Sequence, residues 1–487
     1  MSERIPTLSG GSMFGHVREL RGDRLNFIRR MSAECDGILR IRIFNKSAYF
    51  VNSPRLLHEV LVEKSKSFEK SSVLRYMLYP LAGEGLFTSG GELWRRQRRL
   101  MAPIFQQREI VRFAQCMVDC AVRGASDWSD GQEIDLSRET MRITMSIAGR
   151  TLFEAETFSE ADTLGAALTV ALDWASDTAG TPAPLVQTLL RKNLERLSKQ
   201  LPRKLAEPTR SLADALHGPV LLPTPRSRRL RASIRVLDER VQRMIDERRA
   251  AGLKGQDLLT KLLLARDEDD GSRMTDRQVR DEVLTLFVAG HETTATGLAW
   301  AIELLTRHPD VLRRAVAEAD ALDGPPTFHD LPRLAYTLQI FKEALRLYPP
   351  VYLFSRETSG HVEIGGHPLP RGTVVFMSPY AMHHRADLWP DPERFDPSRF
   401  TSEAEGSRPR MAYFPFSAGP RICIGNHFAL MEGPLVLATL LQRARFESAA
   451  PGAIEPEPSA TLRPRGGIPM RVHLRSPGSW AVARAAG

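Results

Sequence analysis

The most informative stretch of this sequence lies near its C-terminal end and reads Phe416-Ser417-Ala418-Gly419-Pro420-Arg421-Ile422-Cys423-Ile424-Gly425. The pattern of apolar residues predicts that a helix follows at once, from Asn426 to about Leu441. Backbone N–H groups and the positive end of that helix would favour the ionised form of the Cys423 thiol, which is the form that binds a metal. We therefore interpret residues 416–425 as a metal–thiolate loop rather than as a loop with one buried cysteine.

Other residues of this loop suit a flat cofactor that carries carboxylates. Gly419 and Gly425 have no Cβ, so the backbone can turn tightly and lie close to such a cofactor. Arg421 offers a fixed cation for a carboxylate at the cofactor's edge. Phe416 would form an aromatic wall that keeps water from the metal–sulfur bond.

At these residues the chain resembles the cytochrome P450 family of heme-thiolate monooxygenases, whose signature is Phe-x-x-Gly-x-Arg-x-Cys-x-Gly. The resemblance implies that Cys423 is the axial ligand of heme b (iron protoporphyrin IX) and that dioxygen is the co-substrate. A thiolate ligand favours O–O cleavage, whereas a histidine would suit reversible oxygen binding or peroxidase chemistry. It also implies the fold of that family, which is mainly α with a small β-rich portion (α+β) and has the heme between a long central helix and the Cys-loop helix.

A second motif lies inside a long predicted helix over residues 275–306, which a capping box of Thr275 and Gln278 would begin. Its middle reads Ala289-Gly290-His291-Glu292-Thr293-Thr294. A glycine inside a helix costs about 1 kcal/mol relative to alanine, and a buried carboxylate needs partners, so the stretch is locally unfavourable. Taken alone, threonine hydroxyls that bond back to the preceding turn explain it equally well.

The family resemblance gives this helix a role in oxygen activation. It implies that Ala289 and Gly290 form a groove over the heme, and that Thr293 with Glu292 delivers protons to reduced dioxygen. His291 and Thr294 would point away from the heme.

Two further motifs resemble parts of the family that hold the heme and its loop. Glu343 and Arg346, spaced i, i+3 on a helix, would form a buried charged network with Arg394 of Pro392-Glu393-Arg394-Phe395. Trp94 and Arg98, spaced i, i+4, would reach the heme propionates together with Arg356 and Arg421. Solvent exposure is the alternative for any one of these arginines.

The predicted substrate-facing wall is apolar and aromatic. Residues 83–89 resemble the loop that precedes the Trp-x-x-x-Arg helix in bacterial fatty-acid hydroxylases of the family, where a phenylalanine sits over the heme. The predicted wall consists of Phe87, Phe287, Ala289, Val351, Leu353, Phe354 and Ile468; for each of them, packing in the core is the alternative. Residues 155–225 would roof the site and carry no recognisable substrate code.

Length and composition point to one large globular domain over residues 1–487, with a formal charge of +9 and 42% hydrophobic residues. Strand-like alternation at residues 37–53, 351–380 and 445–475 means that both ends of the chain feed the β-rich portion. There is no run of eighteen apolar residues and no signal-like N-terminus, so we expect a soluble bacterial cytoplasmic monomer without a transmembrane anchor. Four cysteines argue against a disulfide framework. The basic clusters lack interleaved aromatics, so we expect no nucleic-acid partner.

Taken together, the sequence predicts insertion of one atom of dioxygen into a lipophilic molecule such as a fatty acid, terpenoid, steroid or polyketide. Electrons would come from a separate ferredoxin or flavodoxin and its NAD(P)H-dependent reductase, since the chain ends soon after the terminal strands. Two alternatives remain: a peroxide-driven or isomerising enzyme on the same heme, against which Glu292 and Thr293 weigh, and a non-catalytic heme-binding sensor.

Overall fold

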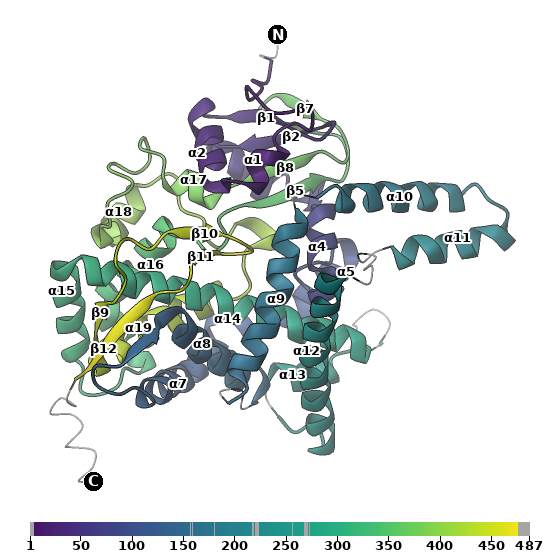
Figure 1. Ribbon diagram of the computed structural model, residues 1–487. Helices are drawn as coiled ribbons and strands as arrows, with labels where there is room; N and C mark the ends of the chain where they lie inside the picture. The colour runs from purple at the N-terminus through teal and green to yellow at the C-terminus, as the bar shows by residue number, and fades with distance from the viewer. Residues whose placement is uncertain are drawn as a thin grey trace.

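The computed structural model describes residues 4–475, apart from residues 156, 158, 180, 217–218, 220–223, 256, 267–270 and 272. Most of the chain is helical, and the long helix α14 (Asp276–Arg307) runs through the middle of the helical body (Figure 1). A smaller β-rich part lies at the top of Figure 1, where the N-terminal strands meet strands from the second half of the chain. This is the mainly α architecture with a small β portion that the sequence predicts.

The helices lie along most of the chain. Their bounds are α1 (Val17–Arg21), α2 (Arg24–Glu34), α3 (Pro54–His58), α4 (Ser72–Ala82), α5 (Gly91–Met101), α6 (Gln107–Ile110), α7 (Ala114–Ser126), α8 (Leu136–Phe153), α9 (Ala161–Ala179), α10 (Ala183–Ser198), α11 (Arg203–Ala215), α12 (Pro225–Ala250), α13 (Leu258–Leu264), α14, α15 (Pro309–Asp320), α16 (Ala335–Leu347), α17 (Pro379–His383), α18 (Ser402–Ser407) and α19 (Asn426–Arg443). Short 3-10 or π-helical turns connect several of them, among them Glu59–Glu63, Phe328–Leu334 and Gly419–Arg421.

Within the residues that the structure describes, the strands form four small sheets. Their bounds are β1 (Ile38–Ile43), β2 (Lys46–Val51), β3 (Phe68–Lys70), β4 (Glu133–Asp135), β5 (Phe354–Thr358), β6 (Val362–Ile364), β7 (His367–Leu369), β8 (Val374–Met377), β9 (Ala444–Ser448), β10 (Pro456–Pro458), β11 (Leu462–Pro464) and β12 (Pro469–Leu474). The largest sheet has the order β1-β2-β8-β5-β3, so the first hairpin pairs with strands some 300 residues later.

Two sequence features fix the central helix and the Cys-loop helix. Thr275 caps α14 with both hydrogen bonds of the predicted capping box. The Thr275 side chain accepts from Gln278 N, and the Gln278 side chain accepts from Thr275 N. The Cys-loop helix α19 begins at Asn426, as predicted, and ends two residues beyond the predicted end. Since α14 is buried along most of its length and packs against α8, α16 and α19, a polar residue in its middle lies inside the protein.

Candidate active site

The Cys loop makes a tight backbone turn that contains a glycine at positive φ. Cys423 N donates to Phe416 O over 2.9 Å, which closes the loop on itself. Gly419 has φ +70°, and a Cβ there would lie 1.9 Å from the carbonyl oxygen of Leu61. A Cβ on Gly425 would meet nothing within 4 Å. Gly419 is therefore required by the fold itself, whereas Gly425 leaves the open surface that a flat cofactor needs.

The surroundings of the Cys423 thiol act on its pKa in opposite directions. Its side chain is accessible, but it lies deep enough that burial raises the pKa of the thiol. The Gly425 N–H and the nearby Arg98 guanidinium only partly oppose this effect. For the free thiol, burial therefore outweighs the ionising effect of the loop, and a bound metal would displace the proton.

Helix α14 is buried on most sides, but it has an accessible patch at the predicted oxygen-activation motif. Ala289 is exposed and Thr293 is partly exposed, whereas most residues of α14 before and after these two are buried. The Thr293 hydroxyl donates to Ala289 O over 2.8 Å, which is the back-bonding that the sequence left open. A Cβ on Gly290 would lie 3.7 Å from the Ala148 Cβ of α8, an ordinary van der Waals contact, so packing against α8 does not by itself require a glycine there.

Glu292 is buried and turns toward the C-terminal hairpin. Its Oε1 accepts from the Thr461 hydroxyl over 2.8 Å, so in this structure Glu292 and Thr293 bond to different partners. Burial raises the pKa of Glu292 to about 7, while Thr461 and the Arg463 guanidinium oppose the rise. Arg463 in turn pairs with the partly exposed Asp173 of α9 over 3.0 Å. The charge of Arg463, which is paired with a partly exposed residue, therefore acts on the buried carboxyl.

A cluster of cations lies beside the Cys loop. Arg421 is mostly buried, pairs with Glu69 and stacks on the Trp94 ring, with 4.1 Å from its Cζ to the ring centroid. Its Nη1 is buried without a partner. Burial, together with the charge of Arg421, lowers the pKa of Arg356 to about 10 and that of Lys70 well below its usual value.

This cluster provides a test of whether the site fits a heme. The three cations Lys70, Arg356 and Arg421 are opposed by Glu69 and, at Lys70, also by Glu282. The Nη1 atom of Arg421 is buried without an acceptor. Two propionates would supply the missing negative charge. The accessible thiol, the accessible patch on α14 and the open face of Gly425 also fit a flat ring between α14 and the Cys loop.

The structure brings most of the predicted cofactor contacts together. Trp94 and Arg421 touch, Arg356 lies near Arg421, and Arg98 on α5 is close enough to Cys423 to influence its pKa. Phe416 is partly buried and packs against the main core.

The predicted scaffold network needs one correction. Glu343 and Arg346 are fully buried and bidentate, with N–O distances of 2.7 and 2.8 Å. The Arg394 side chain, however, is exposed, and the residue contributes only its carbonyl, which accepts from Arg346 Nη2 over 3.1 Å. Arg399 takes the predicted place of Arg394, with its Nε 3.5 Å from Glu343 Oε1.

The predicted substrate wall divides into two groups. Phe287 and Ile468 are buried in the main core, and Phe287 stacks on Phe153 with centroids 5.2 Å apart, so for these two the structure favours the alternative of packing in the core. Val351, Leu353 and Phe354 are partly buried, and Leu353 and Phe354 pack against the cores of the β-rich part.

Phe87 stays accessible on a loop that is pinned at both sides. Lys70 Nζ donates to the carbonyls of Leu86 and Phe87 over 2.7 Å, and the Leu86 N–H donates to Glu282 of α14 over 2.9 Å. Burial raises the pKa of Glu282 to about 8. The loop that carries Phe87 is therefore fixed to α14 on the side of Ala289.

Several contributing residues have no recognisable signal in the sequence. Lys70 and Glu69 come from the short strand β3, and Thr461 and Arg463 come from the C-terminal hairpin. None of them lies in a motif, and only the folded chain brings them to the site.

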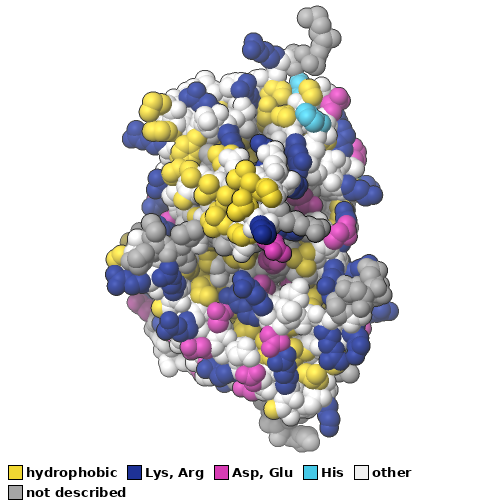
Figure 2. Space-filling view, turned by 90° about the vertical axis from the view of Figure 1, so that its right-hand side faces the viewer, with side chains coloured by type: hydrophobic (Ala, Val, Ile, Leu, Met, Phe, Trp, Pro, Cys, Tyr) yellow, Lys and Arg dark blue, Asp and Glu magenta, His cyan; other side chains and the backbone are white. Residues whose placement is uncertain are grey.

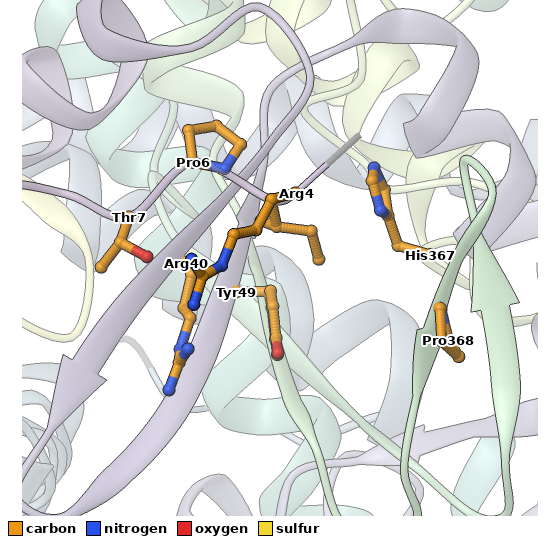
Figure 3. Close-up of a pocket in the computed structure, with 8 residues that line it drawn as sticks. Arg4, Pro6, Thr7, Arg40, Tyr49, His367 and Pro368 are labelled. Atoms are coloured by element: carbon orange, nitrogen blue, oxygen red, sulfur yellow. The ribbon is translucent and has the colours of Figure 1, made fainter. Parts of the chain in front are cut away.

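An open hollow of about 530 Å³ lies elsewhere, on the N-terminal sheet. It is lined by Arg4, Ile5, Pro6, Thr7, Arg40, Tyr49, His367 and Pro368 (Figure 3). None of these residues belongs to the motifs above, so this hollow is distinct from the candidate active site.

Comparison with known proteins decides the family. The sequence profile of the cytochrome P450 family matches residues 6–468. The chain belongs to the cytochrome P450 family. Within the family it is similar to the pentalenene oxygenase of Streptomyces avermitilis (34% identity over 95% of this chain and 96% of that one) and to the cyclooctat-9-en-7-ol 5-monooxygenase of Streptomyces melanosporofaciens (35% identity over 92% and 89%).

The fold agrees with this assignment. The crystal structure of the cytochrome P450DA heme domain matches with a TM-score of 0.79 and 28% identity, over 97% of this chain and 98% of that one. This P450 is thus a monooxygenase that uses heme and dioxygen. Among the residues that the structure describes, no helix is long and apolar enough to cross a membrane.

Proposed function

We propose that this P450 inserts one oxygen atom into a terpenoid, with electrons supplied by a separate ferredoxin or flavodoxin and its NAD(P)H-dependent reductase. The single observation that carries the substrate class is the similarity, over nearly the whole chain, to relatives named for oxidation of pentalenene and of cyclooctat-9-en-7-ol. The accessible Phe87 and Ala289, on a pinned loop and on the central helix, are suited to an apolar substrate.

In this proposal Cys423 holds the heme iron, and Arg98, Arg356 and Arg421 with Trp94 hold the propionates. The heme, when bound, would supply the activation of dioxygen. Gly419 and Phe416 fix the loop that aims the sulfur, and the Glu343–Arg346 pair fixes the chain that leads to it.

The protons move through the chain's own residues. Glu292, with a pKa of about 7, can hold or release a proton near neutral pH. It accepts from Thr461, and the charge of the partly exposed Arg463–Asp173 pair acts on it. Thr293 lies one residue further along α14 and has a hydroxyl that can turn from Ala289 O toward the substrate side. We assign the last proton transfer to Thr293 and its reloading to Glu292.

The electron donor would dock on α5. Arg95 and Arg99 are exposed on this helix, while Trp94 and Arg98 of the same helix reach toward the heme site. An acidic electron-transfer protein would complement these charges.

The test is a binding and turnover comparison with the purified heme protein. Pentalenene and cyclooctat-9-en-7-ol should displace the iron-bound water and shift the absorption spectrum, and a fatty acid such as palmitate should do so more weakly. Turnover with a surrogate ferredoxin and reductase should give hydroxylated product in amounts that depend on NAD(P)H. If palmitate binds and turns over better than either terpenoid, the proposed substrate class is wrong.

A further inference from the structure

Helix α7 carries two cysteines that the heme site does not use. Cys116 and Cys120 are spaced i, i+4, so their side chains lie on the same face of the helix. Helix α7 packs against α8 and α19 in the lower part of the body in Figure 1. Cys120 is fully buried, whereas Cys116 is partly exposed. The pair therefore lies inside the protein, with one of its side chains within reach of solvent.

Three hydrogen-bond donors converge on the Cys120 sulfur. The Cys116 thiol donates to it from the preceding turn of α7. From α8, the Ser146 hydroxyl donates over 3.3 Å and Arg150 Nη1 donates over 3.6 Å. A free cysteine that only fills space in a core needs no such partners. Donors of this kind, one of them a cation, favour the ionised sulfur, which is the form that binds a metal.

The spacing of the two thiols decides between a disulfide and a bound metal. Side chains at i, i+4 of a helix have Cβ atoms about 5–6 Å apart, whereas a disulfide brings its Cβ atoms to about 3.5–4.5 Å. A disulfide would therefore require α7 to unwind. A metal ion in line between two sulfurs, with bonds of about 2.3 Å each, separates the sulfurs by about 4.6 Å, which the i, i+4 spacing allows.

The number and kind of ligands select the metal. Within the residues that the structure describes, no group of three or more His, Cys, Asp or Glu side chains is placed to hold a metal ion. Zinc takes four protein ligands at structural sites and three at catalytic sites, so two thiols do not suit it. Monovalent copper is a soft ion that thiolates select, and two sulfurs are enough to hold it.

The charges around the pair also suit monovalent copper. Two thiolates and one Cu⁺ leave a single net negative charge in the interior, and a buried charge needs a partner. The Arg150 guanidinium, which already donates to Cys120, supplies that partner. Burial holds the pKa of the neighbouring Glu432 of α19 well above its usual value, so this carboxyl adds no second negative charge.

We propose that Cys116 and Cys120 bind one monovalent copper ion between their sulfurs. The ion enters at the partly exposed Cys116, which gives up its proton when the metal–sulfur bond forms. Ser146 and Arg150 are positioning residues that bond to the Cys120 sulfur. No electron is transferred in this step. The site is separate from the heme and does not depend on the identity of the substrate.

The experiment is an anaerobic titration of the full-length heme protein with Cu(I) in the presence of bicinchoninate, which competes for the ion. Native mass spectrometry counts the copper retained. The wild type should retain one copper per chain, and Cys116→Ser and Cys120→Ser should each lose it. Arg150→Gln should weaken the affinity about 10–100-fold, because a ligand loses the group that orients it. Copper should also raise the unfolding temperature of the wild type but not that of Cys116→Ser.

Cys35→Ser is the matched control. Cys35 is also partly exposed, but its sulfur bonds to backbone groups, the Gly37 N–H and the Ile38 carbonyl. This variant should retain one copper with the affinity of the wild type. All variants should keep the carbon monoxide spectrum of the wild type, which shows that the heme site is folded. Because Cys116 is partly exposed, Cys116→Ser keeps the test decisive if the buried Cys120→Ser fails to fold.

Three results would overturn the proposal. They are no copper retained by the wild type, equal copper in the wild type and Cys116→Ser, or a disulfide between Cys116 and Cys120 in protein that was never exposed to copper. The last result would assign the pair to thiol–disulfide chemistry. Failure to oxidise terpenoids would leave the copper titration untouched, so this proposal and the proposed function can fail separately.

Discussion

Helix α14 and the α10–α11 hairpin are both amphipathic, but they place their chemistry in opposite directions. Helix α14 carries acids and hydroxyls into the protein, where Glu292 and its neighbours are held by partners from α8 and the C-terminal hairpin. The α10–α11 hairpin carries leucines out of the protein, and hydrophobic side chains gather on the face toward which it projects (Figure 2). Polar groups are tolerated inside only where the surrounding chain satisfies them, and apolar groups are tolerated outside only where something else covers them. The buried polar groups of α14 and the exposed leucines of the hairpin both cost free energy that packing within the same element does not offset, so each region indicates a function.

The largest expected effect is at the candidate active site, to which α14 belongs. Cys423→Ser should abolish heme-thiolate ligation, because a hydroxyl does not replace a thiolate on iron. The carbon monoxide adduct should lose the spectrum of a sulfur ligand, and turnover should fall to background. Cys35→Ser, which changes a cysteine of the N-terminal region, should keep both.

The next effect concerns the stability of the scaffold. Arg346→Ala leaves Glu343 buried without its bidentate partner and removes bonds to three carbonyls, so the free energy of unfolding should fall by about 3–5 kcal/mol. Denaturant unfolding of the heme protein measures it.

Arg394→Ala is the matched control for that measurement. Its side chain is exposed and its carbonyl is unaffected by the substitution, so the change should stay within about 0.5 kcal/mol. Equal losses in the two variants would restore the predicted role of the Arg394 side chain.

A smaller effect is expected at the accessible patch of α14. Thr293→Ala should leave the heme spectrum and stability nearly unchanged but should divert electrons to peroxide, because the last proton donor is lost. Peroxide formed per NAD(P)H consumed should rise several-fold. Thr306→Ala removes a hydroxyl with a similar back-bond, to Glu303 O over 2.7 Å, near the end of the same helix. It should leave coupling unchanged; if both variants leak equally, the assigned role of Thr293 is wrong.

The subtlest expected effect is a pH dependence. The folded-state pKa of Glu292, about 7, lies above its usual value, so its protonation stabilises the fold at low pH and this contribution is lost as pH rises toward 7. Glu292→Gln should remove that slope, at most about 1.4 kcal/mol per pH unit, in unfolding measured from about pH 5 to about pH 8. It should also slow turnover and flatten its pH profile near 7. An unchanged profile would place the titrating group elsewhere, with Arg463 and Asp173 as the charged neighbours to test next.

The sequence by itself determined the family, the Cys loop, the long helix with its capping box and the i, i+3 pair of Glu343 and Arg346. These are local patterns: a glycine at positive φ, a cap and a helix face are each specified by residues a few positions apart.

The tertiary structure decided the rest, because these interactions join residues far apart in the chain. It brought Lys70 and Glu69 to Arg421, gave Glu292 a partner in Thr461, replaced the Arg394 side chain by Arg399, and placed Phe287 and Ile468 in the core. It also turned the leucines of α10 outward. An amphipathic pattern specifies two faces, but only the packing of the whole chain decides which of them meets the protein.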